Sequence, residues 1–300
     1  MAKRTLLVTS AVFLLGLLAL TIVLVGAHRQ IRAIEPPLPQ LHLIQSALPH
    51  ELGLASISYV NTATQSGPLG TIGHVGVLLE WADGRVFLID TGMPPDRAQA
   101  FGAPMETLLG ADPTETHGSL DAQLGDAVNA ITGVGFTHLH SDHTDGLPPL
   151  CAAQREPATL YQTRLQKEQL NFGTQPGEDN ILAASCPRQV VGDEVLKEVP
   201  GYPGLLMIAA GGHTPGSTVF AARYRVKVWV FSGDITNDRQ SLLDNTPKHW
   251  AYRTFIVPEY EFHQEQLRLW LASMIVDEGF EVMVSHDIGA WEASDLEVWH

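Results

Sequence analysis

Three histidines and one aspartate lie within six consecutive residues of the chain, at positions 138, 140, 142 and 143. A short apolar run precedes them and a glycine and two prolines follow, so we expect a short strand that runs into a polar loop. His138 and His140 point to the same side of an extended segment, since side chains alternate there with a period of two. Both imidazoles can therefore reach one ion. Asp142 and His143 lie past the strand end, where the turning chain can direct them to a neighbouring ion.

The spacing of this motif distinguishes a metal site from a solvated loop. A lone His-x-His pair occurs more often in a solvated histidine-rich loop, whereas His-x-His-x-Asp-His after an apolar strand is far more specific. Imidazole and carboxylate groups together suit zinc and its first-row neighbours. The sequence therefore predicts a transition-metal site at this strand end.

Four further segments each place polar residues directly after an apolar run. They are Asp90-Thr91-Gly92, Gly212-His213-Thr214-Pro215-Gly216, Ser232-Gly233-Asp234 and Ser285-His286-Asp287. Together with the first motif, they resemble in order and wording the signature of the metallo-β-lactamase superfamily. The five motifs extend from residue 86 to 287, which is most of the chain beyond its N-terminus.

The resemblance implies a dinuclear site that binds two zinc ions per chain. The ligands carried over are His138, His140 and His213 for one ion, Asp142, His143 and His286 for the other, and Asp234 for both. Each ion then keeps an open position, as catalytic zinc requires. A water shared by the ions would lose its proton near neutral pH and act as the nucleophile, so the implied chemistry is hydrolysis. Asp142 and Asp234 are the candidate catalytic residues.

Three differences from related families narrow the set of relatives that the chain resembles. Flavodiiron-type relatives place a glutamate where His140 stands. The best-known lactamase subgroup has a cysteine at the position of Asp234 and no histidine at that of His143. These differences favour the dinuclear glyoxalase II, lactonase and phosphodiesterase relatives. Quorum-quenching lactonases place a tyrosine three residues after the bridging aspartate, where this chain has Asn237, and this weakens a lactonase assignment.

Several polar residues outside the ligand set are candidates for smaller roles. We expect Asp90 to support the site by hydrogen bonding, while for Asp145 and Asp287 a supporting role and plain solvation are equally open. Eight histidines are expected at the surface or in the core, and His74 and His263 are the least secure of these assignments. The eight are His28, His42, His50, His74, His117, His249, His263 and His300.

The elements that must position these residues alternate between strands and helices. We predict strands over 54–60, 74–81, 85–89, 217–222 and 226–231, and helices over 95–109, 120–130, 163–170 and 261–276. The dipeptide Asp83-Gly84 predicts a hairpin turn between the second and third strands. Two β-rich halves flanked by helices agree with the fold that the resemblance implies, an α/β protein built as an αββα four-layer sandwich.

Two segments of less regular sequence could border the site. The stretch 171–204 is longer than most loops, so it is a functional insertion or contains an element that the pattern does not show. We expect it to form a wall or lid over the metals, with Phe172 and Leu182 as apolar contacts. Because no ligand lies within it, its shortening should leave both metals bound. For Trp250, Tyr252 and Phe255, core packing is favoured over the lining of a pocket mouth.

The N-terminus carries an uncharged run of 23 residues, 5–27. A helix of that length spans about 34 Å, enough for a bilayer core of about 30 Å. The apolar part of a signal peptide has only about 7–15 residues, so an uncleaved transmembrane anchor over 1–27 is favoured over a signal segment. Prolines predict a spacer over 28–50, and 51–300 would form one catalytic domain.

Charge and cysteine content bear on location and partners. The 33 acidic and 18 basic side chains give a formal net charge of −15, which disfavours nucleic acid and anionic lipid as partners. We favour a cytoplasmic N-terminus and an extracytoplasmic, periplasmic body. Cys151 and Cys186 can pair there or be buried thiols in any compartment.

Three functions are compatible with these observations. The leading one is a membrane-anchored dinuclear zinc hydrolase that cleaves a small ester, thioester, lactone or β-lactam. The alternatives are a phosphodiesterase acting on small phosphodiesters and a non-catalytic, metal-dependent binding protein. Seven intact ligands argue against the last, since a binding module has no need for two open metal positions.

Overall fold

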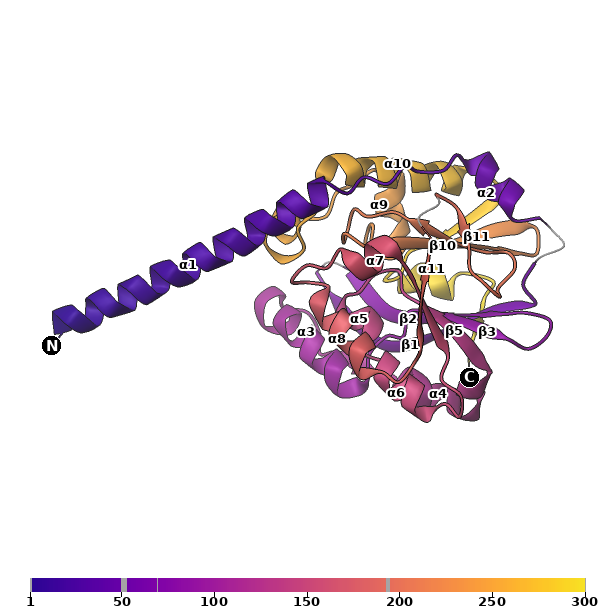
Figure 1. The fold of residues 1–300 in the computed structure, drawn as a ribbon, viewed down its shortest axis with the longest axis horizontal. Coiled ribbons are helices and arrows are strands. Elements are labelled where there is room, and N and C mark those ends of the chain that lie inside the picture. Colours follow the sequence, from indigo (N-terminus) through magenta and orange to yellow (C-terminus); the bar gives the residue numbers. More distant parts are fainter. Residues whose placement is uncertain (1, 50–52, 69, 193–194, 300) are drawn as a thin grey trace.

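Two β-sheets face each other in the computed structural model, and helices cover their outer faces (Figure 1). The structure describes residues 2–49, 53–68, 70–192 and 195–299. The architecture is the αββα sandwich that the sequence predicts. The predicted boundary between spacer and domain, at residues 50–51, and the assignments of His50 and His300 lie outside the described residues.

The helices and strands follow one another along the whole described chain. The helices are α1 (Ala2–Arg32), α2 (Leu41–Ala47), α3 (Pro95–Leu109), α4 (Leu120–Leu124), α5 (Ser141–Thr144), α6 (Leu147–Ala153), α7 (Arg164–Glu168), α8 (Gln175–Ala183), α9 (Arg239–Leu243), α10 (Glu261–Val276) and α11 (Ile288–Glu292), with a 3₁₀ turn η2 (Gly125–Ala130) and a π-helical turn η3 (Tyr252–Ile256). The strands are β1 (Ser56–Gly67), β2 (Gly70–Glu80), β3 (Val86–Ile89), β4 (Glu115–Thr116), β5 (Ile131–Gly135), β6 (Thr159–Thr163), β7 (Arg188–Val191), β8 (Lys197–Glu198), β9 (Leu205–Ala209), β10 (Thr218–Tyr224), β11 (Lys227–Phe231), β12 (Phe280–Met283) and β13 (Glu297–Val298).

The strand order brings the ends of several strands to one edge of the sandwich. The first sheet has the order β13-β1-β2-β3-β5-β6-β7, with β4 beside β1, and the second has the order β12-β11-β10-β9-β8. Strands β3, β5 and β6 are parallel, as are β11 and β12. The amide of Thr218 donates to the carbonyl of Thr137 over 2.7 Å, so β10 begins where β5 has just ended. Side chains that follow β5, β9, β11 and β12 therefore meet at this edge.

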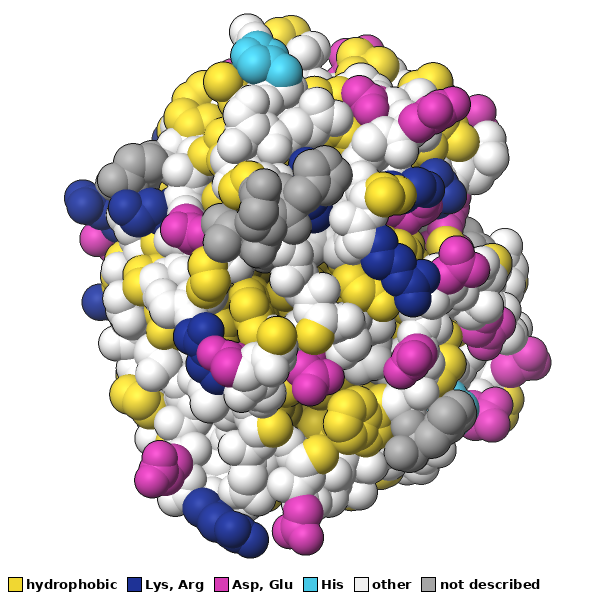
Figure 2. Space-filling model, turned by 90° about the vertical axis from the view of Figure 1, so that its right-hand side faces the viewer, with side chains coloured by type: hydrophobic (Ala, Val, Ile, Leu, Met, Phe, Trp, Pro, Cys, Tyr) yellow, Lys and Arg dark blue, Asp and Glu magenta, His cyan; other side chains and the backbone are white. Residues whose placement is uncertain are grey.

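Three apolar layers hold the sandwich together. The central layer lies between the two sheets and includes Phe87, Phe220 and Phe231. One outer layer packs α2 and α10 on the second sheet, and the other packs α4 and α6 on the first. The two hairpins that the sequence predicts are both confirmed, since β2 pairs with β3 and β10 with β11 in antiparallel register. Figure 2 shows the end of the body farthest from α1, where acidic and basic side chains are dispersed among apolar ones.

The helix predicted over 120–130 and the irregular stretch 171–204 both differ from expectation. The helix ends at Leu124, and the chain continues as a 3₁₀ turn that begins at Gly125, whose φ is 54°. The irregular stretch contains α8, β7 and β8. The sequence pattern hides α8 because Pro176 and Gly177 lie in its first turn, where proline is tolerated. It hides β7 because this strand at the edge of its sheet is mostly exposed.

The N-terminal helix continues past the predicted span and into the body. Helix α1 ends at Arg32, and Ala27 and Ile31 are buried. The segment predicted as a spacer is also packed, because Ile44 and Leu48 are fully buried in the outer layer of the second sheet. The proline-rich spacer that the sequence predicts over 28–50 therefore packs on the body in its described part. Pro36, Pro37 and Pro39 lie between the packed helices α1 and α2 and do not hold the body at a distance from α1.

Candidate metal centre

The seven predicted ligands come together at the edge of the sandwich where four strands end. Residues 138–143 follow β5, and the last three of them lie in the short helix α5. His213 follows β9, Asp234 follows β11 and His286 follows β12. His140 is partly buried and the other six are buried, so this edge holds a cluster of ionisable groups that has little access to water.

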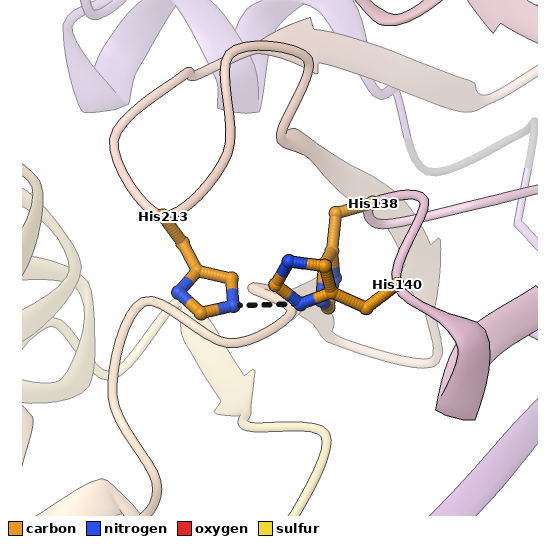
Figure 3. A group of neighbouring side chains, drawn as sticks. All are labelled: His138, His140 and His213. Carbon is orange, nitrogen blue, oxygen red and sulfur yellow. Dashed lines mark hydrogen bonds between the residues drawn. The ribbon is translucent and has the colours of Figure 1, made fainter. Parts of the chain in front are cut away.

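The imidazoles of His138, His140 and His213 face one another across a small space (Figure 3). Nδ1 of His140 lies 3.0 Å from Nε2 of His138 and 3.3 Å from Nε2 of His213. Ligand nitrogens of a tetrahedral zinc ion with Zn–N bonds of about 2.0 Å lie about 3.3 Å from one another. The spacing of these three nitrogens therefore fits one face of such a coordination shell.

The second group consists of Asp142, His143, Asp234 and His286, whose ligand atoms lie within 4.8 Å of one another. Nε2 of His286 is 3.3 Å from Oδ2 of Asp142 and 2.9 Å from Oδ2 of Asp234. Nε2 of His143 is 3.5 Å from Oδ2 of Asp142 and from Oδ1 of Asp234. These four side chains form a second set of convergent nitrogen and oxygen donors.

Asp234 also reaches the first group. Its Oδ2 lies 3.8 Å from Nε2 of both His138 and His213. Nε2 of His143 and Oδ1 of Asp234 are buried without a hydrogen-bond partner, which is costly unless another group satisfies them. A pair of cations between the groups would do so, and the nitrogen and carboxylate donors suit zinc-like ions. The residues present therefore fit a dinuclear metal site.

Asp90 supports the second group as the sequence predicts. Its Oδ2 lies 2.9 Å from Nδ1 of His143, and its two oxygens accept hydrogen bonds from the amide and hydroxyl of Thr137 over 2.8 and 2.7 Å. A carboxylate can only accept, so Nδ1 of His143 must carry a proton, and Nε2 is the nitrogen that would bind an ion. The hydrogen bonds thus fix both the tautomer and the orientation of His143.

Glu259 and Lys248 provide a corresponding support for His213, and the sequence analysis missed both. Oε1 of Glu259 lies 2.8 Å from Nδ1 of His213, and both side chains are buried. Nζ of Lys248 lies 3.1 Å from the same nitrogen and 3.7 Å from Oε1 of Glu259. Neither residue belongs to a motif. Their only sequence signal is a charged group in the irregular segment that precedes α10.

Of the histidines without a predicted role, His74 lies at the site and His263 does not. Nδ1 of His74 is 3.5 Å from Oδ2 of Asp142, and its ring packs edge-on against those of His286 and Phe101. His74 is buried, as the expectation of a surface or core position allowed, but it is buried at the site itself. His263 lies on α10, with Nε2 2.7 Å from the carbonyl of Ala210, and so supports the chain before His213.

The structure decides the roles of two aspartates that the sequence left open. Asp145 is buried and accepts hydrogen bonds from Arg97 over 2.8 Å and from Asn180 over 2.7 Å. Asp287 accepts from the amide of Ala290 at the start of α11 over 3.1 Å. Both hold neighbouring elements in place and are not plain solvated groups.

Burial and neighbouring cations keep the first group of histidines neutral. Burial, together with the charge of His143, holds the pKa of His138 well below its usual range, and burial and Lys248 do the same for His213. Burial lowers the pKa of His140 to about 4. All three imidazoles are therefore neutral near pH 7, as metal ligands must be.

The second group is zwitterionic before it receives an ion. Burial alone would raise the pKa of Asp142 and Asp234, but the surrounding histidines hold both pKa values well below the usual range. Burial alone would likewise lower the pKa of His143 and His286. The facing carboxylates instead raise the pKa of His286 to about 10 and that of His143 well above its usual value.

Two segments border the mouth of this centre. A Cβ added to Gly173 would lie 3.3 Å from Nε2 of His140, so the start of the 171–204 stretch borders the first group, next to the partly exposed Phe172. On the other side Tyr252 stacks under Lys248, 5.4 Å from Nζ to the ring centroid. Trp250 and Phe255 are exposed, so the core packing favoured for these aromatics is wrong, and they lie at the surface.

Comparison with known proteins gives one family and a set of similar folds. The family model described as the metallo-beta-lactamase superfamily matches residues 70–261. An N-acyl homoserine lactone hydrolase with the product N-hexanoyl-L-homoserine at its catalytic metal center is 14% identical, with a TM-score of 0.60, and the match covers 81% of this chain and 98% of that one.

Two further solved structures are similar in fold. A quorum-quenching N-acyl homoserine lactone lactonase is 15% identical with a TM-score of 0.60, over 81% of this chain and 97% of that one. A probable metal-dependent hydrolase from Staphylococcus aureus is 18% identical with a TM-score of 0.56, over 79% and 90%. At these identities the likeness concerns the fold. No curated protein sequence matches the chain.

Proposed function

The chain belongs to the metallo-beta-lactamase superfamily, and from this premise we propose that it is a hydrolase that uses two zinc ions to cleave a small carbonyl substrate. The substrate classes are an ester, a thioester, a lactone or a β-lactam. The observation that carries the proposal is the pair of convergent donor groups joined by Asp234, because a single structural metal would need only one of them.

In this proposal each ligand group holds one ion. His138, His140 and His213 hold the first, Asp142, His143 and His286 hold the second, and Asp234 contacts both. When bound, the ions supply a deprotonated water as nucleophile and polarise the carbonyl oxygen. Asp90 keeps Nδ1 of His143 protonated, and Glu259 lies within hydrogen-bond distance of Nδ1 of His213, so Nε2 of each histidine faces the ion site.

One comparison favours a carbonyl substrate, and one sequence difference weakens the assignment of a lactone. The similar lactone hydrolase carries a ring-opened acyl homoserine at its metal centre, which favours carbonyl chemistry in this fold. Asn237 is exposed, and no tyrosine follows Asp234 at the spacing of quorum-quenching lactonases.

Tyr252 of η3 lies against Lys248, near the metal-binding residues. Burial, and then the charges of Asp234 and Glu259, raise the pKa of its hydroxyl well above the usual value. Its hydroxyl therefore stays protonated and can donate a hydrogen bond to a substrate oxygen.

A substrate screen with parallel metal analysis tests the proposed function. Purified full-length protein in detergent would be assayed against esters, thioesters, lactones, β-lactams and phosphodiesters, with Asp234→Ala as the inactive control. We expect two zinc ions per chain and turnover of at least one carbonyl class. Turnover of phosphodiesters alone would favour the phosphodiesterase alternative, and two bound ions without any turnover would favour the binding protein.

We also propose that α1 anchors the protein with its body outside the cytoplasm. One helix in the described chain, over residues 12–32, is long and apolar enough to cross a membrane. Cys151 and Cys186 form a disulfide between α6 and the segment after α8. Disulfides persist mainly in oxidising compartments such as the periplasm, and this supports the proposed orientation.

A further inference from the structure

The end of α1 lies at the mouth of the metal centre. Nε2 of His28 is 3.0 Å from the carbonyl of Thr254 in η3, and the side-chain amide Nε2 of Gln30 donates to the carbonyl of Leu170 over 3.1 Å. These contacts are made to the two segments that border the metal-binding histidines. The first continues to Glu259, which bonds His213, and the second continues to Gly173, which lies against His140.

Helix α1 and the body form one continuous packed unit. The helix runs from residue 2 to 32, so it passes without interruption from its exposed apolar part into the body. Ala27 and Ile31 are buried there. Because no linker separates the two parts, the direction in which α1 leaves the body fixes which face of the body meets the membrane. In Figure 1, α1 projects from the body beside the segment between α9 and α10.

Large apolar side chains are exposed on that segment and in the first turn of α10. Trp250, Phe255, Ile256 and Phe262, which we call the apolar rim, are 59%, 56%, 61% and 56% exposed. The rings of Trp250 and Phe255 lie 6.1 Å apart. An apolar patch of this kind is an interaction site in most proteins, and tryptophan and other aromatics are typical of the membrane–water interface. The position of the rim beside α1 selects the bilayer as its partner.

Basic side chains lie where the lipid headgroups would be. A hollow between α1 and η3 is lined by Arg29 and Arg32 of α1 and by Arg253 of η3. Glu259 and Glu261 also line it, and Glu261 pairs with Arg253 over 2.9 Å. Arg32 stacks on Tyr260, 5.7 Å from the ring centroid. Arginine at the end of an apolar helix is favoured at the level of the headgroups. Since Glu259 also contacts His213, the hollow comes within one side chain of the metal centre.

We propose that the mouth of the metal centre rests on the bilayer surface and that the substrate is an amphiphile drawn from the membrane. The apolar chain of the substrate would remain among the lipids and the apolar rim, while its hydrolysable carbonyl group reaches the ions. Phe101 on α3, which packs on His74, adds an apolar contact at the opposite side of the site. This inference rests on the proposed hydrolase function and on an uncleaved α1.

A quenching experiment tests the membrane-facing surface without any assay of activity. Both native cysteines are paired, so Phe255→Cys introduces the one reactive thiol for a polarity-sensitive fluorophore. The control is Val226→Cys, because Val226 is 76% exposed in the β10–β11 turn, at the strand ends opposite to the site. In phosphatidylcholine vesicles that contain spin-labelled lipid, we expect at least about threefold stronger quenching at position 255. Equal quenching at the two positions would overturn the proposal.

A kinetic experiment tests the source of the substrate. Two esters with the same headgroup would be compared in vesicles, one with a short soluble chain and one with a long chain that partitions into lipid. At constant total substrate, added carrier lipid lowers the mole fraction of the long-chain ester in the bilayer, so we expect the long-chain rate to fall and the short-chain rate to stay constant. The double variant Phe255→Asp/Ile256→Asp should lower the ratio of long-chain to short-chain kcat/KM at least tenfold, whereas Val226→Asp should not change it.

Failure of the membrane inference can be distinguished from failure of the proposed hydrolase function. A long-chain rate that does not change when carrier lipid is added, together with an unchanged ratio in the double variant, would overturn the membrane inference and leave the hydrolase proposal intact. Absence of turnover for every carbonyl class in the substrate screen would instead contradict the proposed function, and the quenching result would then still decide the position of the rim.

Discussion

At the residue scale, the two donor groups differ in what they need before they can bind a metal. The first group is neutral imidazole, held so by burial, while the second combines two carboxylates with two protonated histidines. Asp234 belongs to the second group and touches the first. This asymmetry gives the two ions different expected affinities and different sensitivities to pH.

Removal of single ligands should therefore have unequal effects. We expect His138→Ala to bind one ion per chain and Asp234→Ala to bind fewer than one, because Asp234 contacts both groups. Elemental analysis after gel filtration would measure the ratio. A wild-type chain with one ion or fewer would contradict the dinuclear site.

Glu259 is expected to strengthen binding of the first ion through His213. Loss of a carboxylate that orients a metal-binding histidine typically costs about 10–100-fold in affinity, so Glu259→Ala should weaken the first site by about tenfold or more. A competition titration with a chromophoric chelator would measure this. Glu278→Ala, at an exposed position of the same body, is the control. Equal affinities in the two variants would show that Glu259 only fills space.

Uptake of the second ion should depend on pH and uptake of the first should not. The raised pKa values of His143 and His286 mean that both carry a proton at pH 7, which the ion must displace. Affinity of the second site should therefore rise with pH between 6 and 8, by about tenfold per unit for each proton displaced. The first site has nothing to displace, since its three histidines are already neutral.

The comparison of single-site variants makes this pH dependence measurable. His138→Ala isolates the second site and His286→Ala isolates the first, and each would be titrated with zinc at pH 6, 7 and 8. A pH indicator in weak buffer should report proton release only from the His138→Ala chain. Proton release from both variants would contradict the different charge states of the two groups.

At the element scale, α8 supports the helix that carries two of the ligands and is more than a lid over the site. Asn180 of α8 donates to Asp145 over 2.7 Å and to Thr144 over 3.1 Å, so α8 packs directly on the helix that carries Asp142 and His143. The expectation that 171–204 can be shortened without metal loss therefore needs revision. Its central helix is part of the support of the ligands.

Gly177 gives the sharpest test of this support. A Cβ at this position would lie 2.2 Å from the carbonyl oxygen of Leu139, which stands between His138 and His140. We expect Gly177→Ala to displace that backbone and to lower metal content and turnover together by at least about tenfold. In Gly289→Ala the new Cβ would meet only Oδ1 of Asp287, at 3.8 Å, so this control should keep both ions. Full metal content in Gly177→Ala would show that α8 moves away at little cost.

At the scale of the whole molecule, α1 and the body form one unit. The full-length chain should sediment with membranes and resist extraction by high salt, because the exposed apolar part of α1 can span a bilayer. Detergent should release it with both ions bound. Recovery of a soluble chain that begins at His28 would show that a signal peptidase removes the segment, although such a cut falls beside the buried Ala27.

Local patterns determined much of this protein because its ligands follow apolar strands. Alternation and turn residues predicted the hairpins, and the amphipathic run 261–276 predicted α10 with its observed bounds. The five motifs predicted which residues meet at the edge of the sandwich, since side chains after parallel strands share one edge. The sequence also indicated an apolar helix at the N-terminus.

Only the tertiary structure decided which residues support the ligands and where the body lies relative to α1. Glu259 contacts His213, which is 46 residues away in the chain, and His74 contacts Asp142, which is 68 residues away. A local sequence pattern does not indicate contacts over such separations. Likewise, prolines in 28–50 predicted a spacer because composition is local, whereas Ile44 and Leu48 are buried against the distant strands of the second sheet. Long-range packing fixes these positions, and it places the end of the apolar helix α1 at the mouth of the candidate metal centre.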